Sequence, residues 1–329
     1  NVNLAKLKSA IIASGAGIDN ITVKNNIVDA YGTPVSGLFG DRNAVSINYG
    51  GPTNYRVATG GVDNILFQNN TVNGSLPTSF FRSGVATDES GGTFTGNTLR
   101  GISADILSRF GSNGNINVTG NTLNGGGVEL SDMNAGAGVL TVSGNAFDAT
   151  FANAANPGTA VMRVKNNYNA KTTSIAENTF VNHDWAVSLE NYNSLTVTKN
   201  VFTPLAASTV FHHVTVNTKS ISSNSASIVQ VQSAADITQN IFNGSGVVGG
   251  SAVTFLNHDS DAASFGTFNV NENSFDLNSG LGTTSSDYFD RTLGLGYVKS
   301  SLMLLGLVIA LLAAWHYATG AIRVDQITT

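Results

Sequence analysis

The sequence contains no cysteine, so neither a disulfide framework nor a thiolate metal site can form. Proline occurs only five times, which is too few for a proline-rich disordered linker. Lys and Arg total 16, are scattered and leave a net charge of −5, which argues against binding of nucleic-acid phosphates. Charged residues make up 11% of the chain, whereas an ordinary globular surface carries roughly 25–35%. Ser, Thr, Asn and Gly replace them, so the surface of the protein is expected to carry mainly hydroxyl and amide groups.

What the chain does contain is a short repeated pattern: apolar, any, apolar, two polar residues, Asn, any, apolar. Its apolar positions alternate, as at Ile116 and Val118, and a period of two is the period of a β-strand. The marked Asn returns ten times, at Asn26, Asn70, Asn97, Asn121, Asn145, Asn178, Asn200, Asn224, Asn240 and Asn273. The steps between them are 44, 27, 24, 24, 33, 22, 24, 16 and 33 residues, and we interpret 44 as two steps of 22. A recurrent spacing of this size indicates a solenoid.

Each marked Asn stands two residues after a predicted strand, where the chain must bend. Asn tolerates left-handed backbone geometry and bonds to its neighbours, so it suits a corner. Asn side chains at equivalent corners of successive coils would stack about 4.8 Å apart and share amide hydrogen bonds. The next apolar residue, such as Leu123 or Phe180, would begin a second strand with its side chain inward. Each copy therefore predicts one coil: strand, Asn corner, second strand and a loop of varied length.

This pattern, with its frequent GNT, NNT and ENT corners, resembles the repeat of the right-handed parallel β-helix superfamily. That superfamily includes pectate lyases, phage tailspikes and many bacterial surface proteins. The resemblance covers roughly residues 15 to 280 and implies an all-β solenoid of about ten coils, which we place at residues 15–285. The alternative, a sandwich or barrel of short strands, does not account for a side-chain pattern repeated at near-constant spacing. Because this fold carries lyases, hydrolases, adhesins and inert scaffolds, the resemblance does not by itself assign an activity.

The first 14 residues carry Leu4, Leu7, Ile11 and Ile12 at helical spacing. Residues 1–14 are therefore expected to form an amphipathic helix that caps the first coil, since open solenoid ends need covering. The segment is too charged and its apolar run too short for a secretory signal. The chain begins with Asn, so we expect either that a signal was removed before Asn1 or that the sequence is incomplete.

Near the other end, residues 300–322 contain no Asp, Glu, Lys or Arg. As a helix rising 1.5 Å per residue they would span about 34 Å, enough for a bilayer core of about 30 Å. Trp315 and Tyr317 stand where an interfacial aromatic belt would lie. We predict a single transmembrane helix at 300–322, preceded by a linker at 286–299 and followed by a tail at 323–329. The alternatives are a buried helix and an end cap.

Four small residues in this segment recur every fourth position: Gly306, Ala310, Ala314 and Ala318. They would let a membrane-protein partner or a second copy of the helix approach closely, although the composition of membrane helices also produces such spacing by chance. His316 is a candidate ligand for a porphyrin or chlorin metal because ionisable residues in membrane helices are often functional. It lies at the end of the span, where an interfacial His needs no such role, and we expect no cofactor.

The few charges that flank the segment do not decide its orientation. The precedent of exported β-helices places the solenoid on the periplasmic or extracellular side of a single-pass anchor. The expected partners are the lipid bilayer and a membrane protein or a second copy. Surface Asn, Thr and Tyr leave carbohydrate open as a ligand.

Resemblance to pectate lyases implies, for an enzyme, a calcium site of clustered carboxylates beside a basic residue. Few carboxylates recur here, and Asp259 with Asp261 supplies too few oxygens for calcium. The motif Asn-His-Asp occurs twice, at His183 and at His258. One interpretation is an acid–base site. The interpretation that we favour is two loops with similar turns. On a strand, the adjacent pair His212-His213 would point one ring inward and one outward, which suits no metal. We predict no catalytic residue and no metal site.

These features together predict a non-enzymatic, membrane-anchored, exported β-helix scaffold. It would act as an accessory subunit of a membrane complex or as a surface adhesion protein. The alternative function is a membrane-tethered polysaccharide lyase or glycoside hydrolase.

Overall fold

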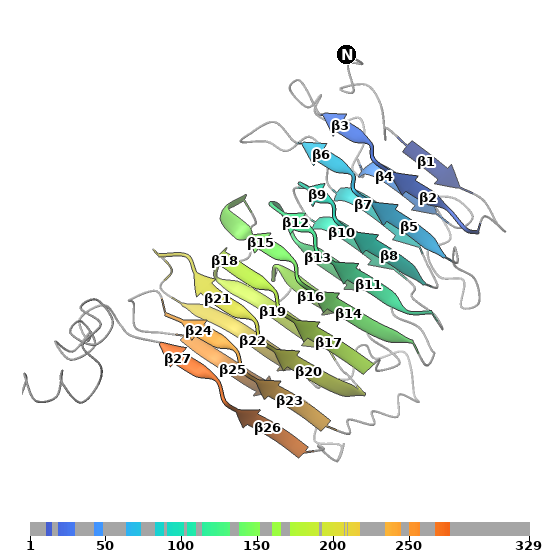
Figure 1. Ribbon diagram of the computed structural model, residues 1–329. Helices are drawn as coiled ribbons and strands as arrows, with labels where there is room; N and C mark the ends of the chain where they lie inside the picture. The colour runs from blue at the N-terminus through green and yellow to red at the C-terminus, as the bar shows by residue number, and fades with distance from the viewer. Residues whose placement is uncertain are drawn as a thin grey trace, which may run out of the picture. The chain divides into compact units, whose positions relative to one another are not determined.

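The computed structural model consists, in the part that it describes, of three parallel β-sheets with nine strands each (Figure 1). The residues described are 11–14, 19–29, 43–48, 64–73, 83–88, 91–101, 104–109, 114–131, 138–151, 160–165, 172–190, 193–206, 208, 210–217, 234–244, 250–256 and 267–276.

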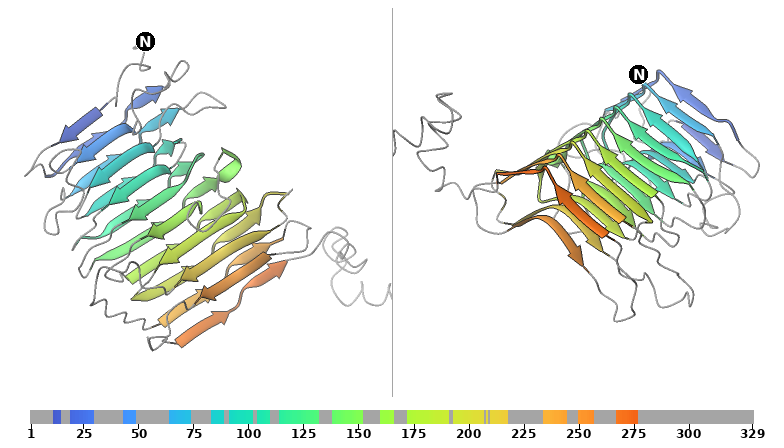
Figure 2. Two further views of the ribbon diagram at one scale, coloured as in Figure 1. Left: turned by 180° about the vertical axis from the view of Figure 1, so that it is seen from behind. Right: turned by 60° about the horizontal axis from the view of Figure 1, so that its bottom comes forward.

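Each coil of the chain adds one strand to each sheet in the order A, B, C, as Figure 2 shows from two sides. Sheet A contains β1 (Ile11–Ser14), β4 (Asn43–Asn48), β7 (Ser83–Asp88), β10 (Ala104–Arg109), β13 (Val128–Ser131), β16 (Met162–Lys165), β19 (Trp185–Glu190), β22 (Phe211–Asn217) and β25 (Gly250–Leu256). Sheet B contains β2 (Thr22–Lys24), β5 (Ile65–Gln68), β8 (Gly92–Thr95), β11 (Ile116–Thr119), β14 (Val139–Ser143), β17 (Thr172–Ala176), β20 (Ser194–Thr198), β23 (Ala234–Thr238) and β26 (Thr267–Asn271). Sheet C contains β3 (Ile27–Asp29), β6 (Thr71–Asn73), β9 (Thr98–Leu99), β12 (Thr122–Leu123), β15 (Ala146–Asp148), β18 (Thr179–His183), β21 (Val201–Pro204), β24 (Ile241–Asn243) and β27 (Ser274–Asp276). A short 3₁₀ helix, η2 (Ala149–Phe151), follows β15.

The prediction of an all-β solenoid of parallel coils is confirmed by these sheets. The coil count differs, because the described residues form nine coils instead of about ten. The 44-residue step from Asn26 to Asn70 is one coil, since β2 pairs directly with β5. The step from Asn200 to Asn240 is also one coil, since β20 pairs directly with β23. Sequence spacing misled here because strand pairing fixes the rise of a coil but leaves the length of its loops free.

The start of the chain also differs from the prediction. Residues 11–14, expected at the end of a capping helix, form strand β1, which pairs in parallel with β4. The β-branched pair Ile11 and Ile12 favours a strand, and an available partner strand outweighs the helical spacing. Residues 1–10 lie outside the described part of the structure.

The interior of the coils is apolar and continuous. Along sheet B, inward residues alternate with outward ones, so that Ile116 and Val118 are fully buried while the residues between them are only partly covered. In sheet C one inward position holds Phe in five successive coils: Phe147, Phe180, Phe202, Phe242 and Phe275. Neighbouring rings stack with centroids 4.5, 4.9, 5.0 and 5.2 Å apart. The coil spacing therefore matches the distance at which aromatic rings attract one another.

The corner between sheets B and C has a fixed backbone shape. The residue before each of the nine marked Asn residues that the structure describes has φ between 52° and 65°, and these residues are Asn25, Asn69, Gly96, Gly120, Gly144, Glu177, Lys199, Gln239 and Glu272. The sequence assigned this left-handed geometry to the marked Asn itself, which was wrong by one position. Asn is instead selected at the next position by its side-chain hydrogen bonds.

The predicted membrane segment 300–322, its residues Gly306, Ala310, Ala314, Ala318 and His316, and the flanking 286–299 and 323–329 lie outside the described residues. Within the described ranges, no helix has the length and apolar character needed to cross a bilayer. The chain divides into two compact units, Asn1–Leu277 and Asn278–Thr329.

The left-handed corner predicts opposite effects for two substitutions. Gly120→Ala should lower the free energy of unfolding by about 1 kcal/mol, because a Cβ there meets no atom within 4 Å and only the backbone is strained. Lys199→Gly should be more stable than Lys199→Ala by about 1 kcal/mol, because glycine relieves the same strain. Urea unfolding of the four proteins measures both differences, and equal midpoints for the two Lys199 variants would contradict this account.

Candidate functional site

The marked Asn residues form a hydrogen-bonded ladder along the corner between sheets B and C. At Asn145, Oδ1 accepts hydrogen bonds from the backbone N and from Nδ2 of Asn121, both at 2.9 Å. Its Nδ2 donates to the carbonyl oxygen of Val118 at 2.8 Å and to Oδ1 of Asn178 at 2.9 Å. Each amide between the two ends of the ladder thus accepts twice from the preceding coil, and donates to both the following coil and the preceding one.

The ladder joins nine of the ten predicted corners: Asn26, Asn70, Asn97, Asn121, Asn145, Asn178, Asn200, Asn240 and Asn273. Successive side chains are linked at 2.8–3.2 Å. The tenth, Asn224, is not a rung between its predicted neighbours, because Asn200 bonds directly to Asn240. Asn224 lies outside the described residues.

Only an amide side chain can satisfy this position. Asp lacks the two donors, and Ala leaves a buried backbone N–H of the preceding coil without its acceptor. The seven rungs from Asn70 to Asn240 are all at most 2% exposed. The ladder is therefore a structural element and does not present a reactive group to solvent.

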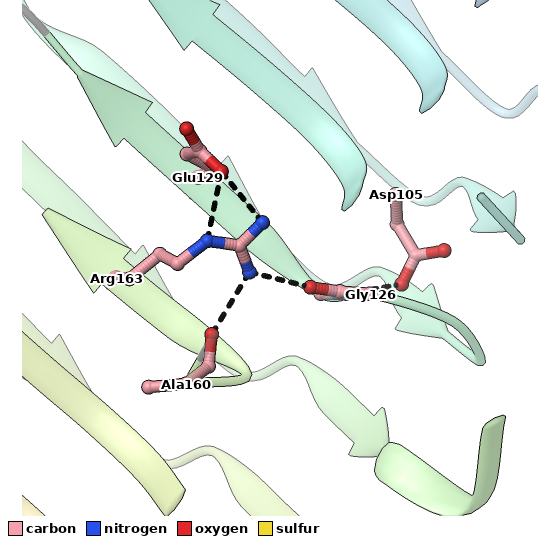
Figure 3. Close-up of polar contacts among 6 residues, drawn as sticks. Asp105, Gly126, Glu129, Ala160 and Arg163 are labelled. Atoms are coloured by element: carbon pink, nitrogen blue, oxygen red, sulfur yellow. Dashed lines mark hydrogen bonds and ion pairs between the residues drawn. The ribbon is translucent and has the colours of Figure 1, made fainter. Parts of the chain in front are cut away.

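A second polar cluster links two coils at sheet A (Figure 3). Arg163 on β16 binds Glu129 on β13, with Nε and Nη2 lying 2.8 and 2.7 Å from the same carboxylate oxygen. Its Nη1 donates to the carbonyl oxygens of Gly126 and Ala160, both at 2.9 Å. These four contacts use donors on all three guanidinium nitrogens, so Arg163 fastens coils together and is not positioned for a ligand.

Asp105 lies beside this cluster and is fully buried (Figure 3). Its carboxylate accepts hydrogen bonds from the backbone N–H groups of Gly101 at 2.8 Å, Gly125 at 3.1 Å and Gly127 at 2.9 Å. Burial raises the pKa of Asp105 to about 7, although these donors and the charge of Arg163 oppose the shift. A carboxylate enclosed in this way closes a turn, and it has no exposed face from which to exchange protons with a substrate.

A third cluster, which sequence reasoning missed, is a buried histidine pair. Nε2 of His183 lies 2.9 Å from Nδ1 of His213, and Nε2 of His213 lies 2.9 Å from the carbonyl oxygen of Asn243. A carbonyl oxygen can only accept, so His213 carries its proton on Nε2 and, when neutral, accepts from His183. Nδ1 of His183 is then a buried acceptor without a protein partner. Burial lowers the pKa of His213 to about 4 and holds that of His183 well below its ordinary value.

The sequence treated His183 as a turn residue, whereas it ends strand β18 and is fully buried. His258, in the second copy of the motif, lies outside the described residues. His213 turns its ring into the core and His212 is partly exposed, stacked on Trp185 with ring centroids 3.8 Å apart. No sequence signal marks the pairing of His183 with His213, because their 30-residue separation reflects loop length as well as coil length.

His212 also contacts a hydroxyl, since its Nδ1 lies 2.7 Å from Oγ of Ser251. That hydroxyl lies 2.6 Å from Oγ1 of Thr254, so it is held between two polar groups. Nowhere in the described ranges do three His, Asp or Glu side chains gather closely enough to bind a metal ion.

Comparison with known proteins places a match only beyond the coils. The family described as Repeat of Unknown Function (DUF347) matches residues 277–321, which is less than half of the chain. No curated protein and no solved structure matches the chain. The match begins directly after β27 and, apart from Leu277, lies within the second compact unit and not in the solenoid.

The ladder predicts that Asn145→Ala will destabilise the protein by about 3 kcal/mol, because buried groups of Asn121 lose their acceptor. Asn117→Ala is the matched control, since Asn117 faces outward on β11 between two buried residues. Urea unfolding compares the two variants with the parent protein. Equal losses at both positions would show that the ladder contributes no more than a surface amide.

The histidine pair predicts acid sensitivity. Between pH 6.5 and about 4 the unfolded chain binds a proton at residue 213 that the folded chain does not, so stability falls as the pH falls. The loss from this group amounts to about 3 kcal/mol, and His213→Gln should remove it. Asp105 has the opposite effect on stability over the same pH range, because its pKa is raised in the folded protein. It is present in both the parent and His213→Gln, so its contribution is the same in each. The difference between the two pH–stability curves therefore isolates the histidine pair, and parallel curves would exclude the effect.

Proposed function

We propose that the chain is a non-enzymatic, membrane-anchored scaffold whose β-helix is exported and serves as a rigid platform. It would act as an accessory subunit of a membrane complex or as a surface adhesion protein. The observation that carries this proposal is the Asn ladder, which continues through nine coils without a missing rung. Because every coil is bonded to the next along this corner and through three sheets, the unit resists bending.

The polar groups of the solenoid also support a structural role. Asp105 holds a turn, Glu129 binds Arg163, and the row of corner amides is internally satisfied. A glycoside hydrolase needs two carboxyl groups flanking a sugar, and a lyase needs a base beside an exposed face. The buried and paired carboxylates described above do not offer that arrangement.

The anchor rests on the sequence of residues 300–322. The family match at 277–321 includes nearly all of this run and begins after the last strand of the solenoid. An uncharged and largely apolar stretch of this length is stable in a bilayer, and a polar solenoid offers no second apolar core for it. The four small residues from Gly306 to Ala318 would then face a partner helix.

The anchor is tested by extracting membranes of expressing cells with alkaline carbonate. The parent protein should stay in the pellet, whereas a variant with both Leu307→Arg and Leu311→Arg should be extracted. Each Arg near the centre of a membrane helix costs about 2.5–3.5 kcal/mol of insertion free energy. Thr328→Arg, in the tail, is the control and should remain in the pellet. Extraction of the parent protein would refute membrane anchoring.

The detergent-solubilised parent protein also separates the scaffold from its enzymatic alternative. Incubation with acidic polysaccharides and calcium should give no unsaturated or shortened product, and appearance of product would reverse the proposal. A partner that co-purifies in mild detergent, and is lost with Gly306→Leu, would favour the subunit over the adhesion protein.

A further inference from the structure

A histidine and a serine hydroxyl lie side by side near the beginning of strand β25. Strand pairing places His212 on β22 opposite Ser251 on β25, and Trp185 on β19 opposite His212 (Figure 1). All three side chains are partly exposed. The strands are already joined by backbone pairing, so the hydrogen bond between the imidazole and the hydroxyl is not needed to hold these coils together.

Strand β25 approaches β22 closely because its first residue is a glycine. A Cβ at Gly250 would lie 2.7 Å from the carbonyl oxygen of Phe211 and 2.9 Å from its ring, so a larger residue would push the strands apart. This approach brings Oγ of Ser251 to 2.7 Å from Nδ1 of His212. On its other side the imidazole stacks on Trp185 with ring centroids 3.8 Å apart, which fixes the plane of the ring.

The hydrogen bonds allow Ser251 to direct its proton toward the imidazole. When Ser251 donates to Nδ1 of His212, its oxygen can accept from the hydroxyl of Thr254, which lies 2.6 Å away. Nδ1 accepts a hydrogen bond when the ring is neutral and carries its proton on Nε2. Burial lowers the pKa of His212 below its ordinary value, so the ring is neutral at pH 7. A serine hydroxyl within hydrogen-bond reach of a neutral base is an activated nucleophile.

The strands that follow β25 in the same coil expose apolar side chains. Phe268 and Val270 on β26 are 37% and 43% exposed, and Phe275 on β27 is 50% exposed. Phe242, which occupies the place of Phe275 in the preceding coil, is fully buried. The ring of Phe255 on β25 lies 4.3 Å from that of Phe268, so this apolar surface continues onto β25. These strands form the last coil that the structure describes (Figure 1).

We propose that Ser251 is a site of stable acylation, at which an aliphatic acyl group is transferred from a thioester to Oγ with His212 as the base. Nδ1 of His212 takes the hydroxyl proton while Oγ attacks the carbonyl carbon of the thioester. The tetrahedral intermediate then breaks its carbon–sulfur bond, and the departing thiolate takes the proton from His212. The products are one ester at Ser251 and one free thiol. The attached chain would cover the exposed apolar side chains of the last described coil.

This inference goes beyond the scaffold function and does not depend on it. A single stable ester per chain is a modification of the scaffold and does not make it a catalyst with turnover. The ester is measured at Ser251 whether or not the chain spans a membrane. Failure of either proposal therefore leaves the other standing.

The test uses the full chain in mild detergent with two thioesters of N-acetylcysteamine, the S-octanoyl and the S-acetyl compound. Intact-mass spectrometry should show one added octanoyl group per chain, and peptide mapping should place it at Ser251. Ser251→Ala should lose the adduct. His212→Gln should slow its formation by about a hundredfold or more, because the general base is lost. Ser174→Ala, which removes a partly exposed hydroxyl from β17, should react as the parent does.

The length of the acyl chain tests the role of the exposed apolar side chains. Octanoyl transfer should be about tenfold or more faster than acetyl transfer, because each methylene that packs on the exposed rings favours the bound state. Phe275→Ser should lower the octanoyl rate and leave the acetyl rate unchanged, so the acetyl reaction shows that this variant is folded. Phe268→Ser repeats the test on β26. Equal rates of the two thioesters on the parent would overturn the assignment of an aliphatic group.

Urea midpoints equal to that of the parent establish that Ser251→Ala and His212→Gln are folded. Absence of an adduct on the parent after a day at millimolar thioester would overturn the proposal. An adduct that forms equally fast in His212→Gln, or that maps only to other residues, would overturn it equally. Release of more than one thiol per chain would also contradict it, because the ester at Ser251 would then be hydrolysed and would not persist.

Discussion

The architecture depends on one requirement, that a buried amide at the corner between sheets B and C satisfies both its donors and its acceptor. Each rung between the two ends of the ladder, as at Asn145, receives two hydrogen bonds at its oxygen and gives hydrogen bonds from its nitrogen to the coils on both sides. This requirement fixes how one coil sits over the next. It places no limit on the loops at the other corners, so coils of 22 and of 44 residues rise by the same step.

The fixed step aligns every other position of the coil. The phenylalanine column in sheet C stacks at 4.5–5.2 Å because the coils do, and Arg163 reaches Glu129 for the same reason. Alignment also makes interactions that no single coil could form, such as the contact between His183 and His213. In a solenoid each coil contacts only its neighbours, so such links act locally and add along the axis.

The fold was predictable from the sequence because the Asn position and the alternating apolar residues obey local rules. The number of residues in the loops of each coil could not be predicted from the sequence. The 44-residue coil and the absence of Asn224 from its expected place in the ladder follow from pairing between strands, which sequence spacing does not encode. The left-handed residue was misplaced by one, since Asn suits both roles. Strand β1 was missed because an edge strand of sheet A was available to residues whose spacing also fits a helix.

The candidate sites illustrate a general difference between positions in such a coil. At the ladder only Asn works, and nine rungs are Asn. The position that directly follows the inward residue of sheet C is not uniform, and four successive coils carry Asn73, Arg100, Asn124 and Asp148 there. Uniformity there would have indicated packing. The variety in this row reflects contacts that differ from coil to coil, since Asp148, for example, accepts hydrogen bonds from Thr150 and Asn182.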